Sequence, residues 1–173
     1  MYSKILVLVD GSETSRLGLD EAIRLASVTG GRLRLFHVID ELGFALSMDA
    51  FAGRPGDWLE QLRAEGHAVL QAAKTIAEQA GVQAEGVLHE AFARTLHDVV
   101  NDEVTASGAE LIVTGTHGRR GFGRAVLGSN AEQILRHANV PVLLVRAPEA
   151  RAKAGAAEKA TRISLPTGAL AFE

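Results

Sequence analysis

Glycines crowd one segment of the chain at a spacing that suits the binding of a phosphate group. From Val113 to Glu132 the sequence reads VTGTHGRRGFGRAVLGSNAE, which leaves an apolar run and enters a helical pattern at Ser129. Glycine lets the backbone adopt positive φ and come close to a ligand, because no Cβ stands in the way. Successive N–H groups of such a loop attract anions, as does the N-terminus of the following helix. The segment therefore predicts a phosphate site between a strand and a helix.

The polar side chains of the same segment could serve to start the helix as well as to contact a phosphate. Ser129 and Glu132 have the spacing of a capping box, which would start the helix with no ligand present. The Ser129 hydroxyl and the adjacent N–H groups also suit phosphate contact, and the two roles are compatible. Arg119, Arg120 and Arg124 either clamp phosphates or remain solvated charges that raise the local potential. The segment lacks the lysine of a Walker-type loop, so the glycines alone do not establish the ligand.

Asp10, Gly11 and Ser12 form a second polar group, directly after the apolar run KILVLV. One interpretation is that Asp10 or Ser12 caps the helix that follows. The other is that the Asp10 carboxylate hydrogen-bonds a sugar or takes part in Mg²⁺ coordination, since Mg²⁺ favours carboxylate oxygens. No G-x-S-x-G sequence supports Ser12 as an acyl-transfer nucleophile. The six histidines show neither HxxxH nor HxH spacing, so they predict no metal site.

These polar residues lie far apart in the sequence and must be brought together by strands and helices. Along the chain, apolar runs that predict strands alternate with helical patterns. Apolar runs without polar alternation are typical of parallel strands that helices cover on both faces. The predicted strands are Lys4–Val9, Leu33–Ile39, Val82–His89, Glu110–Thr114 and Val140–Val145, and the predicted helices are Glu13–Thr29, Asp57–Ala80, Thr95–Ser107 and Ser129–His137. The order βαβαβαβαβ predicts an α/β fold with a five-stranded parallel open sheet, helices on both faces and right-handed crossovers.

The order of strands in the sheet decides which loops meet. In open α/β sheets ligands bind beyond the carboxyl ends of the strands, at the point where the strand order reverses. With the first strand between the second and the fourth, the order is 3-2-1-4-5, and the residues after Val9 face the loop after Thr114. We therefore expect Asp10 and the glycine-rich loop on two sides of one crevice.

The opening ILVLVDGSE, the order of elements and the late glycine block resemble the universal stress protein family over about Met1–Arg146. Gly115-x2-Gly118-x9-Gly128-Ser129 matches the pattern of the family's ATP-binding subgroup at every defined position. The resemblance implies a Rossmann-like, adenine nucleotide alpha hydrolase-like fold that binds ATP, ADP or AMP. It also implies a homodimer that pairs edge to edge through the strand Val140–Val145.

By the same resemblance, particular positions receive roles at the ligand. Asp10, with Val9 before it, matches the acid on the ribose or metal side, and Val38 matches the residue whose backbone receives the adenine ring. Thr114 and Gly115 would lie near the ribose and the phosphates. The residues that would hold or contact the phosphates are His117, Gly118, Gly128, Ser129 and Asn130. Asn130 departs from the small apolar or hydroxyl residue that is common there, but its N–H can still contribute.

Composition narrows the class of protein. The chain has 173 residues, of which 47% are apolar and 23% charged, and a net charge of −3. Because only 5% of the residues are aromatic and no basic stripe is present, we expect neither nucleic-acid nor anionic-membrane binding. The absence of cysteine excludes thiol catalysis and a disulfide framework. We expect a cytoplasmic protein, since no signal segment opens the chain and no apolar run approaches the roughly 20 residues that cross a bilayer.

We expect one domain over residues 1–148 and a tail over 149–173 that is either partly ordered or docked on its own domain or a partner. The long connection 40–56 forms either a lid or an insertion. Three functions remain open. One is a stress-response or signalling module whose nucleotide state a protein partner recognises, and it is favoured because no general base for efficient hydrolysis stands out. The others are a slow Mg²⁺-dependent ATP hydrolase or phosphotransferase that uses Asp10, and a chaperone-like or structural protein without nucleotide.

Overall fold

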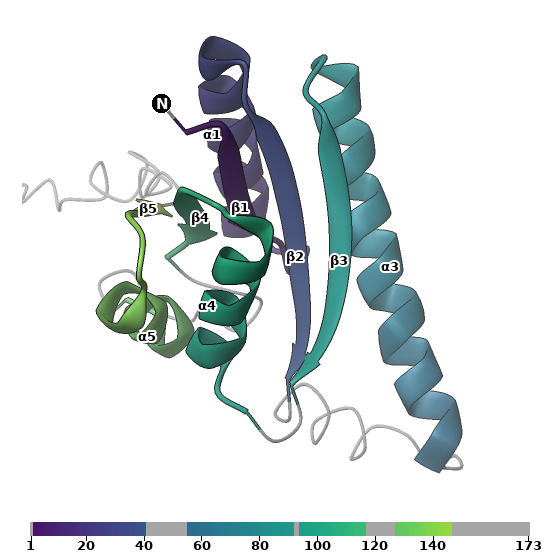
Figure 1. Cartoon of the computed structure of the whole chain (residues 1–173). Helices are drawn as coiled ribbons and strands as arrows, with labels where there is room; N and C mark the ends of the chain where they lie inside the picture. The colour runs from purple at the N-terminus through teal and green to yellow at the C-terminus, as the bar shows by residue number, and fades with distance from the viewer. Residues whose placement is uncertain (1, 41–54, 92–93, 117–126, 147–173) are drawn as a thin grey trace, which may run out of the picture.

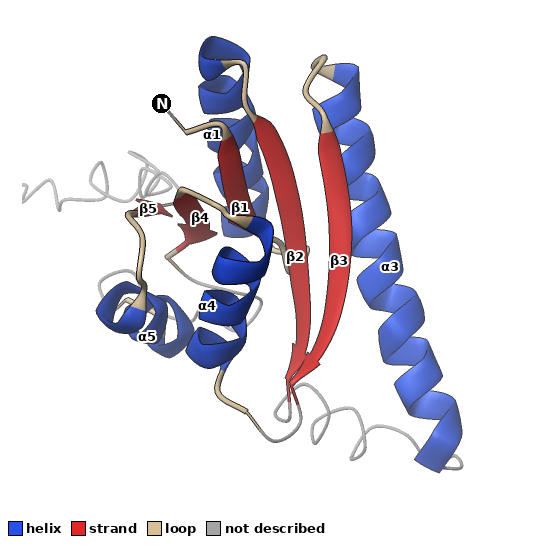
Figure 2. Cartoon of the chain, viewed as in Figure 1, coloured by secondary structure: helices blue, strands red, loops and turns tan. Residues whose placement is uncertain are grey.

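The computed structural model describes residues 2–40, 55–91, 94–116 and 127–146, and strands alternate with helices along them. The elements are β1 (Lys4–Leu8), α1 (Glu13–Thr29), β2 (Arg32–Asp40), α3 (Pro55–Gln79), β3 (Ala84–Ala91), α4 (Leu96–Ser107), β4 (Leu111–Gly115), α5 (Ser129–His137) and β5 (Val142–Val145), as Figures 1 and 2 show. The predicted alternation is confirmed. Helices α1 and α5 have their predicted bounds, and the other elements differ by one or two residues at an end.

The strands form one sheet in the predicted order β3-β2-β1-β4-β5, and every neighbouring pair is parallel. Val7 of the central strand β1 lies opposite Leu35 of β2 and Val113 of β4. A helix connects each strand to the next along the chain, as parallel pairing requires. Because helices cover both faces, β1 is apolar at consecutive positions rather than at alternate ones.

Two apolar cores lie on the two faces of the sheet. Val7 and Leu35 belong to the core under α1 and α3, whereas Phe36 and Ile112 belong to the core under α4 and α5. In Figure 1, α4 covers the face of the sheet that is turned to the viewer. Each of these side chains is at least 99% buried, and burying one of that size stabilises the fold by about 1.5–3 kcal/mol.

The ends of α1 and α4 follow the same local chemistry. Each helix begins at a hydroxyl cap, Ser12 or Thr95, whose side chain accepts a backbone N–H of the first turn. Each ends at a glycine in the left-handed region, Gly30 with φ 69° and Gly108 with φ 65°. The capping residues at both ends can be recognised in the sequence, which explains why the bounds of both helices were predictable to within a residue.

The start of β5 differs from the prediction by two residues. Pro141 has no N–H, so the strand begins at Val142 instead of Val140. The Pro141 carbonyl still accepts a hydrogen bond from the Ile112 N–H at 3.0 Å. As predicted, β5 is an edge strand, and its four residues are partly buried.

Other sequence predictions concern segments that the structure does not describe. The connection 40–56 falls outside the described residues except at its ends, and so does the tail 149–173. The predictions made for them stay predictions. In the described part of the chain, no helix is long and apolar enough to cross a membrane.

Candidate functional site

The carboxyl ends of β1 and β4 meet at the centre of the sheet, where the strand order reverses. The chain passes from β1 to β2 on one side, whereas β4 and β5 lie on the other. Because Val7 lies opposite Val113, the residues after Leu8 and after Gly115 leave the sheet at the same edge. Ligands of open parallel sheets bind at such an edge. The structure therefore brings the Asp10 turn and the start of the glycine-rich segment to one place.

A tight turn carries the chain from β1 into α1 and fixes Asp10. The Asp10 Oδ1 atom accepts a hydrogen bond from the Ser12 N–H at 2.9 Å, and Gly11 takes a φ of 80°, which glycine adopts without strain. Ser12 is the N-cap of α1, and its hydroxyl accepts the Ser15 N–H at 3.2 Å. The interpretation of Ser12 as a cap is confirmed. The Asp10 carboxylate stabilises the same turn and so has a fixed position at the carboxyl edge.

The end of β4 contacts the first turn of α1. Thr114 and Thr116 are buried, and a Cβ added to Gly115 would lie 2.9 Å from the Cβ of Thr14. Helix α1 can come this close to β4 only because residue 115 has no side chain. Gly115 therefore has a packing role that does not depend on a ligand, in addition to the ligand contact predicted for it.

Thr116, the residue directly after β4, hydrogen-bonds to the end of β5 and to the start of α5. The Thr116 N–H donates to the Val145 carbonyl, and the Thr116 carbonyl accepts the Gly128 N–H, both at 2.9 Å. The first turn of α5 thus lies beside the edge at which β4 ends. His117, Gly118 and the three arginines of the predicted loop lie outside the described residues, so their predicted roles stay predictions.

The start of α5 corrects the predicted capping box. Gly128, not Ser129, is the N-cap, and no side chain makes a capping hydrogen bond. Ser129 is already the first helical residue, one position too late to cap, and Glu132 instead forms an ion pair with Arg136 at 2.9 Å. The prediction was wrong because spacing alone does not show which residue has the extended backbone of a cap; here that residue is Gly128.

The first turn of α5 consequently offers backbone N–H groups at the carboxyl edge. Ser129 and Asn130 are exposed, whereas the Glu132 N–H is paired with the Gly128 carbonyl at 2.9 Å. The N–H groups of a helix's first turn have no acceptor within the helix and carry a partial positive charge of about half an elementary charge. An anion at this position would satisfy them.

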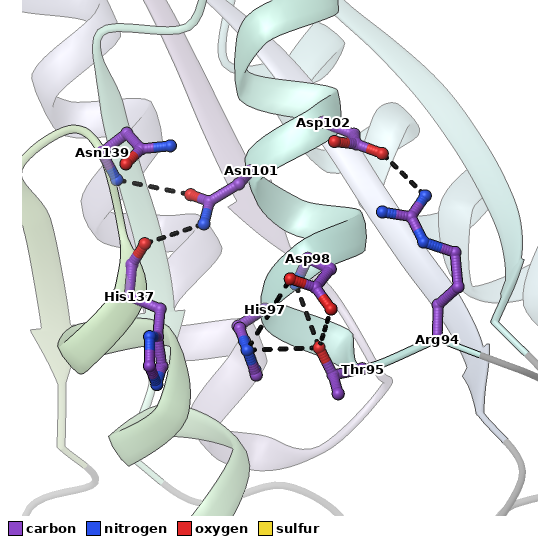
Figure 3. A network of polar contacts seen from close by, with 8 residues as sticks. All are labelled: Arg94, Thr95, His97, Asp98, Asn101, Asp102, His137 and Asn139. Atoms are coloured by element: carbon purple, nitrogen blue, oxygen red, sulfur yellow. Dashed lines mark hydrogen bonds and ion pairs between the residues drawn. The ribbon is translucent and has the colours of Figure 1, made fainter.

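The other end of α5 is held by α4 (Figure 3). The Asn101 side chain donates from Nδ2 to the His137 carbonyl at 2.7 Å and accepts the Asn139 N–H on Oδ1 at 3.3 Å. The rings of His97 and His137 stack with centroids 4.3 Å apart. The Asn101 side chain thus supplies hydrogen-bond partners both to a carbonyl in the last turn of α5 and to an N–H of the chain beyond it. No sequence signal pointed to this contact, because 36 residues separate Asn101 from His137.

The first turn of α4, which contains His97, also carries a carboxyl group with a shifted pKa, that of Asp98. A hydrogen bond from the Thr95 hydroxyl lowers the pKa of Asp98 below its usual range, and the neighbouring His97 and Arg94 act in the same direction. Asp98 is exposed, so solvent screens these charges.

The end of β2 carries a contact that the sequence did not indicate. The His37 side chain is buried, and its Nδ1 atom lies 2.6 Å from the carbonyl oxygen of Val9. Val38 is partly buried and packs toward the opposite face, on the core under α4 and α5. In the described part of the chain, no three His, Cys, Asp or Glu side chains gather closely enough to hold a metal ion. The predicted Mg²⁺ role of Asp10 stays a prediction.

Comparisons with known proteins agree with this architecture. The model of the Universal stress protein family matches residues 1–146. Universal stress protein YxiE of Bacillus subtilis is 32% identical over 151 residues, which cover 84% of this chain and all of the relative. A universal stress protein of Methanocaldococcus jannaschii is also 32% identical, over 86% of this chain and 85% of its own.

Solved structures share the fold. A universal stress protein family member from Burkholderia pseudomallei is 33% identical with a TM-score of 0.64, over 84% of this chain and 97% of its own. An Arabidopsis thaliana family protein with AMP bound has 18% identity and a TM-score of 0.60, over 85% of this chain and 93% of its own. A universal stress protein from Archaeoglobus fulgidus in complex with dAMP has 23% identity and a TM-score of 0.60, over 83% and 98%.

Proposed function

Since this chain belongs to the universal stress protein family, we propose that it binds an adenine nucleotide, ATP or its relatives ADP and AMP, at the carboxyl edge of β1 and β4. The observation that carries the proposal is the start of α5, where no side chain caps the helix. That start coincides with the last two defined positions of the sequence pattern Gly115-x2-Gly118-x9-Gly128-Ser129. Structural relatives that contain AMP or dAMP support the class of ligand.

We assign the phosphates to the N–H groups of Ser129 and Asn130 together with the glycine-rich loop. A phosphate there satisfies N–H groups that the helix leaves unpaired and interacts favourably with the helix dipole. The sequence has Arg119, Arg120 and Arg124 in the same glycine-rich segment, and we expect them either to clamp phosphates or to raise the local potential as solvated charges.

The Asp10 carboxylate and Val38 provide the other contacts in this proposal. Asp10 lies at the end of the central strand, where it can accept from a ribose hydroxyl or contact a phosphate-bound Mg²⁺. Mg²⁺ in nucleotide sites is commonly held by one or two carboxylates together with phosphate oxygens and water. Val38 lies on the strand next to β1, where its backbone can contact the base.

We propose further that the protein acts by binding rather than by turnover. Nucleotide occupancy at α5 would bias the surface that α4 and α5 present, and a protein partner would recognise that surface. Helix α5 is suited to this role because β4 holds its first turn and Asn101 holds its last.

Calorimetric titration of nucleotide-stripped protein with ATP and Mg²⁺, followed by analysis of products in the same sample, tests both proposals. We expect micromolar binding with little ADP formed, and loss of binding in Gly118→Val. Turnover well above about one ATP per minute would contradict a binding module and favour the hydrolase. No binding by the intact protein would remove the nucleotide proposal.

We also propose a homodimer through β5. The strand is an apolar sheet edge, and such edges tend to be covered. Leu143 packs on the core under α1 and α3, so Leu143→Lys adds a charge to the edge strand but also loses packing. Leu143→Ala is the matched control, because it loses packing without adding charge. We expect a raised monomer fraction in sedimentation for Leu143→Lys only, and an unchanged dimer would place the interface elsewhere.

A further inference from the structure

His37 is a buried histidine whose ring lies between the sheet and α3. Only 8% of its surface is exposed, and a Cβ added to Gly66 of α3 would lie 3.0 Å from the His37 Cδ2 atom and 2.6 Å from a methyl group of Leu88. Helix α3 therefore needs a glycine at position 66 to pass over this ring. The surrounding backbone fixes the ring's position.

The contact between His37 and Val9 has a defined direction. A carbonyl oxygen can only accept a hydrogen bond, so the His37 Nδ1 atom, 2.6 Å away, carries the proton and donates it. The bond joins β2 to the residue that directly precedes the Asp10 turn. A ring buried under a helix holds that carbonyl in one place.

The bond between His37 and Val9 lies where the backbone hydrogen bonds between β1 and β2 come to an end. The Arg32 N–H donates to the Ser3 carbonyl, and the Val9 N–H donates to the Phe36 carbonyl. Even-numbered residues of β2 therefore direct their backbone groups toward β1. In a regular parallel ladder, the next bond would run from the Val38 N–H to the Val9 carbonyl.

That next bond is replaced by the histidine side chain. The β1–β2 register ends with the pair Leu8 and Phe36, and between the described residues Val9 and Val38 there is no backbone hydrogen bond. In the structure the Val9 carbonyl is bonded to the His37 side chain and not to the Val38 N–H. The N–H and C=O of Val38 thus face the side on which β1 has ended, without a backbone partner on that strand.

We propose that His37 is a positioning residue for base recognition, because it occupies the Val9 carbonyl and so keeps the Val38 N–H and C=O available to the ligand. This inference rests on the proposed nucleotide site. An N–H donor beside a C=O acceptor complements adenine, which presents the acceptor N7 beside its amino group. Guanine presents two acceptors at the same positions, and its O6 would face the Val38 carbonyl. His37 therefore sets the preference for adenine without touching the base.

Two variants separate this role from simple core packing. His37→Asn keeps an N–H donor close to the position of Nδ1, whereas His37→Leu fills space without a donor. In the absence of nucleotide, amide hydrogen exchange should show Val38 exchanging faster than Phe36, whose neighbouring ladder is complete. In His37→Leu the Val38 amide should become at least tenfold slower, because it bonds the released Val9 carbonyl. In His37→Asn it should stay fast.

Nucleotide affinity provides the second readout. The ratio of ATP to GTP affinity should fall toward one in His37→Leu and be retained in His37→Asn. A slow Val38 amide in the unmodified protein would overturn the inference, and so would unchanged exchange in a folded His37→Leu variant. If His37→Leu does not fold, the unmodified protein and His37→Asn still decide, since both must show a fast Val38 amide. If ATP does not bind at all, the proposed function fails, whereas the exchange experiment still tests the bond that His37 makes.

Discussion

Replacement of the α5 N-cap, Gly128→Asp, should separate phosphate binding from helix stability. Gly128 has φ −61° and ψ 141°, a backbone conformation open to any residue. A carboxylate there would accept N–H groups of the first turn, which are the groups that we assign to the phosphate. The variant should therefore stabilise the helix while it competes with the ligand.

The size of the effect follows from the charge that is added. At a separation of roughly 5 Å and an effective dielectric constant of about 20–40, two unit charges repel by about 1.7–3.3 kcal/mol. This corresponds to ATP binding roughly 15- to 250-fold weaker. The helix itself should gain a few tenths of a kcal/mol, because aspartate is a better N-cap than glycine.

Calorimetry with ATP and thermal unfolding without it measure the two effects. Gly128→Asn is the matched control, since asparagine caps equally well but adds no charge. The difference between the two variants should shrink as salt is added, because salt screens the repulsion. If Gly128→Asp binds ATP as tightly as the unmodified protein, the phosphates do not lie at α5 and the assignment is wrong.

Three further predictions concern the frame of the site. Gly115→Ala should lower the free energy of unfolding, measured in urea, by about 1–3 kcal/mol, because the new Cβ would lie 2.9 Å from Thr14. The control is Gly18→Ala in α1, which should be neutral or stabilising, because its new Cβ would have no neighbour closer than 3.7 Å. Asn101→Ala should cost about 1–3 kcal/mol in the same assay through the two backbone groups that it leaves unpaired, and an unchanged midpoint would show that α5 is held by other contacts. Because the pKa of Asp98 is lowered in the folded protein, its ionised carboxylate stabilises the fold at pH values above the pKa that it has in the unfolded chain, and this stabilisation is lost as pH falls through the folded-state pKa. The free energy of unfolding should therefore fall less steeply on acidification in Asp98→Asn than in the unmodified protein. An identical pH profile for the two proteins would contradict this.

The sequence predicted the fold because its signals are local and agree with one another. Helix α1 lies between a serine cap and a glycine stop, and its predicted bounds are those of the structure. The apolar runs of β1 and β4 indicated strands buried on both faces. Parallel pairing followed from the alternation of strands and helices, and the expected order of strands agrees with the resemblance to a known family.

The details of the site were less predictable because they depend on backbone conformation and on distant contacts. The Ser129 and Glu132 spacing suggested a cap, yet the extended residue is Gly128. The bond between His37 and Val9 spans 28 residues and forms only because the sheet brings β1 beside β2. The pattern of apolar residues within one segment does not indicate hydrogen bonds to residues that are distant in the sequence.

Amide chemical-shift mapping of the nucleotide-stripped protein during titration with ATP and Mg²⁺ tests the central claim most directly. We predict that the amides of Ser129, Asn130 and Val38 shift together and saturate at one equivalent, because phosphates and base occupy the same carboxyl edge. Shifts confined to another surface, or none at saturating ATP, would contradict a nucleotide site at the junction of β1, β4 and α5.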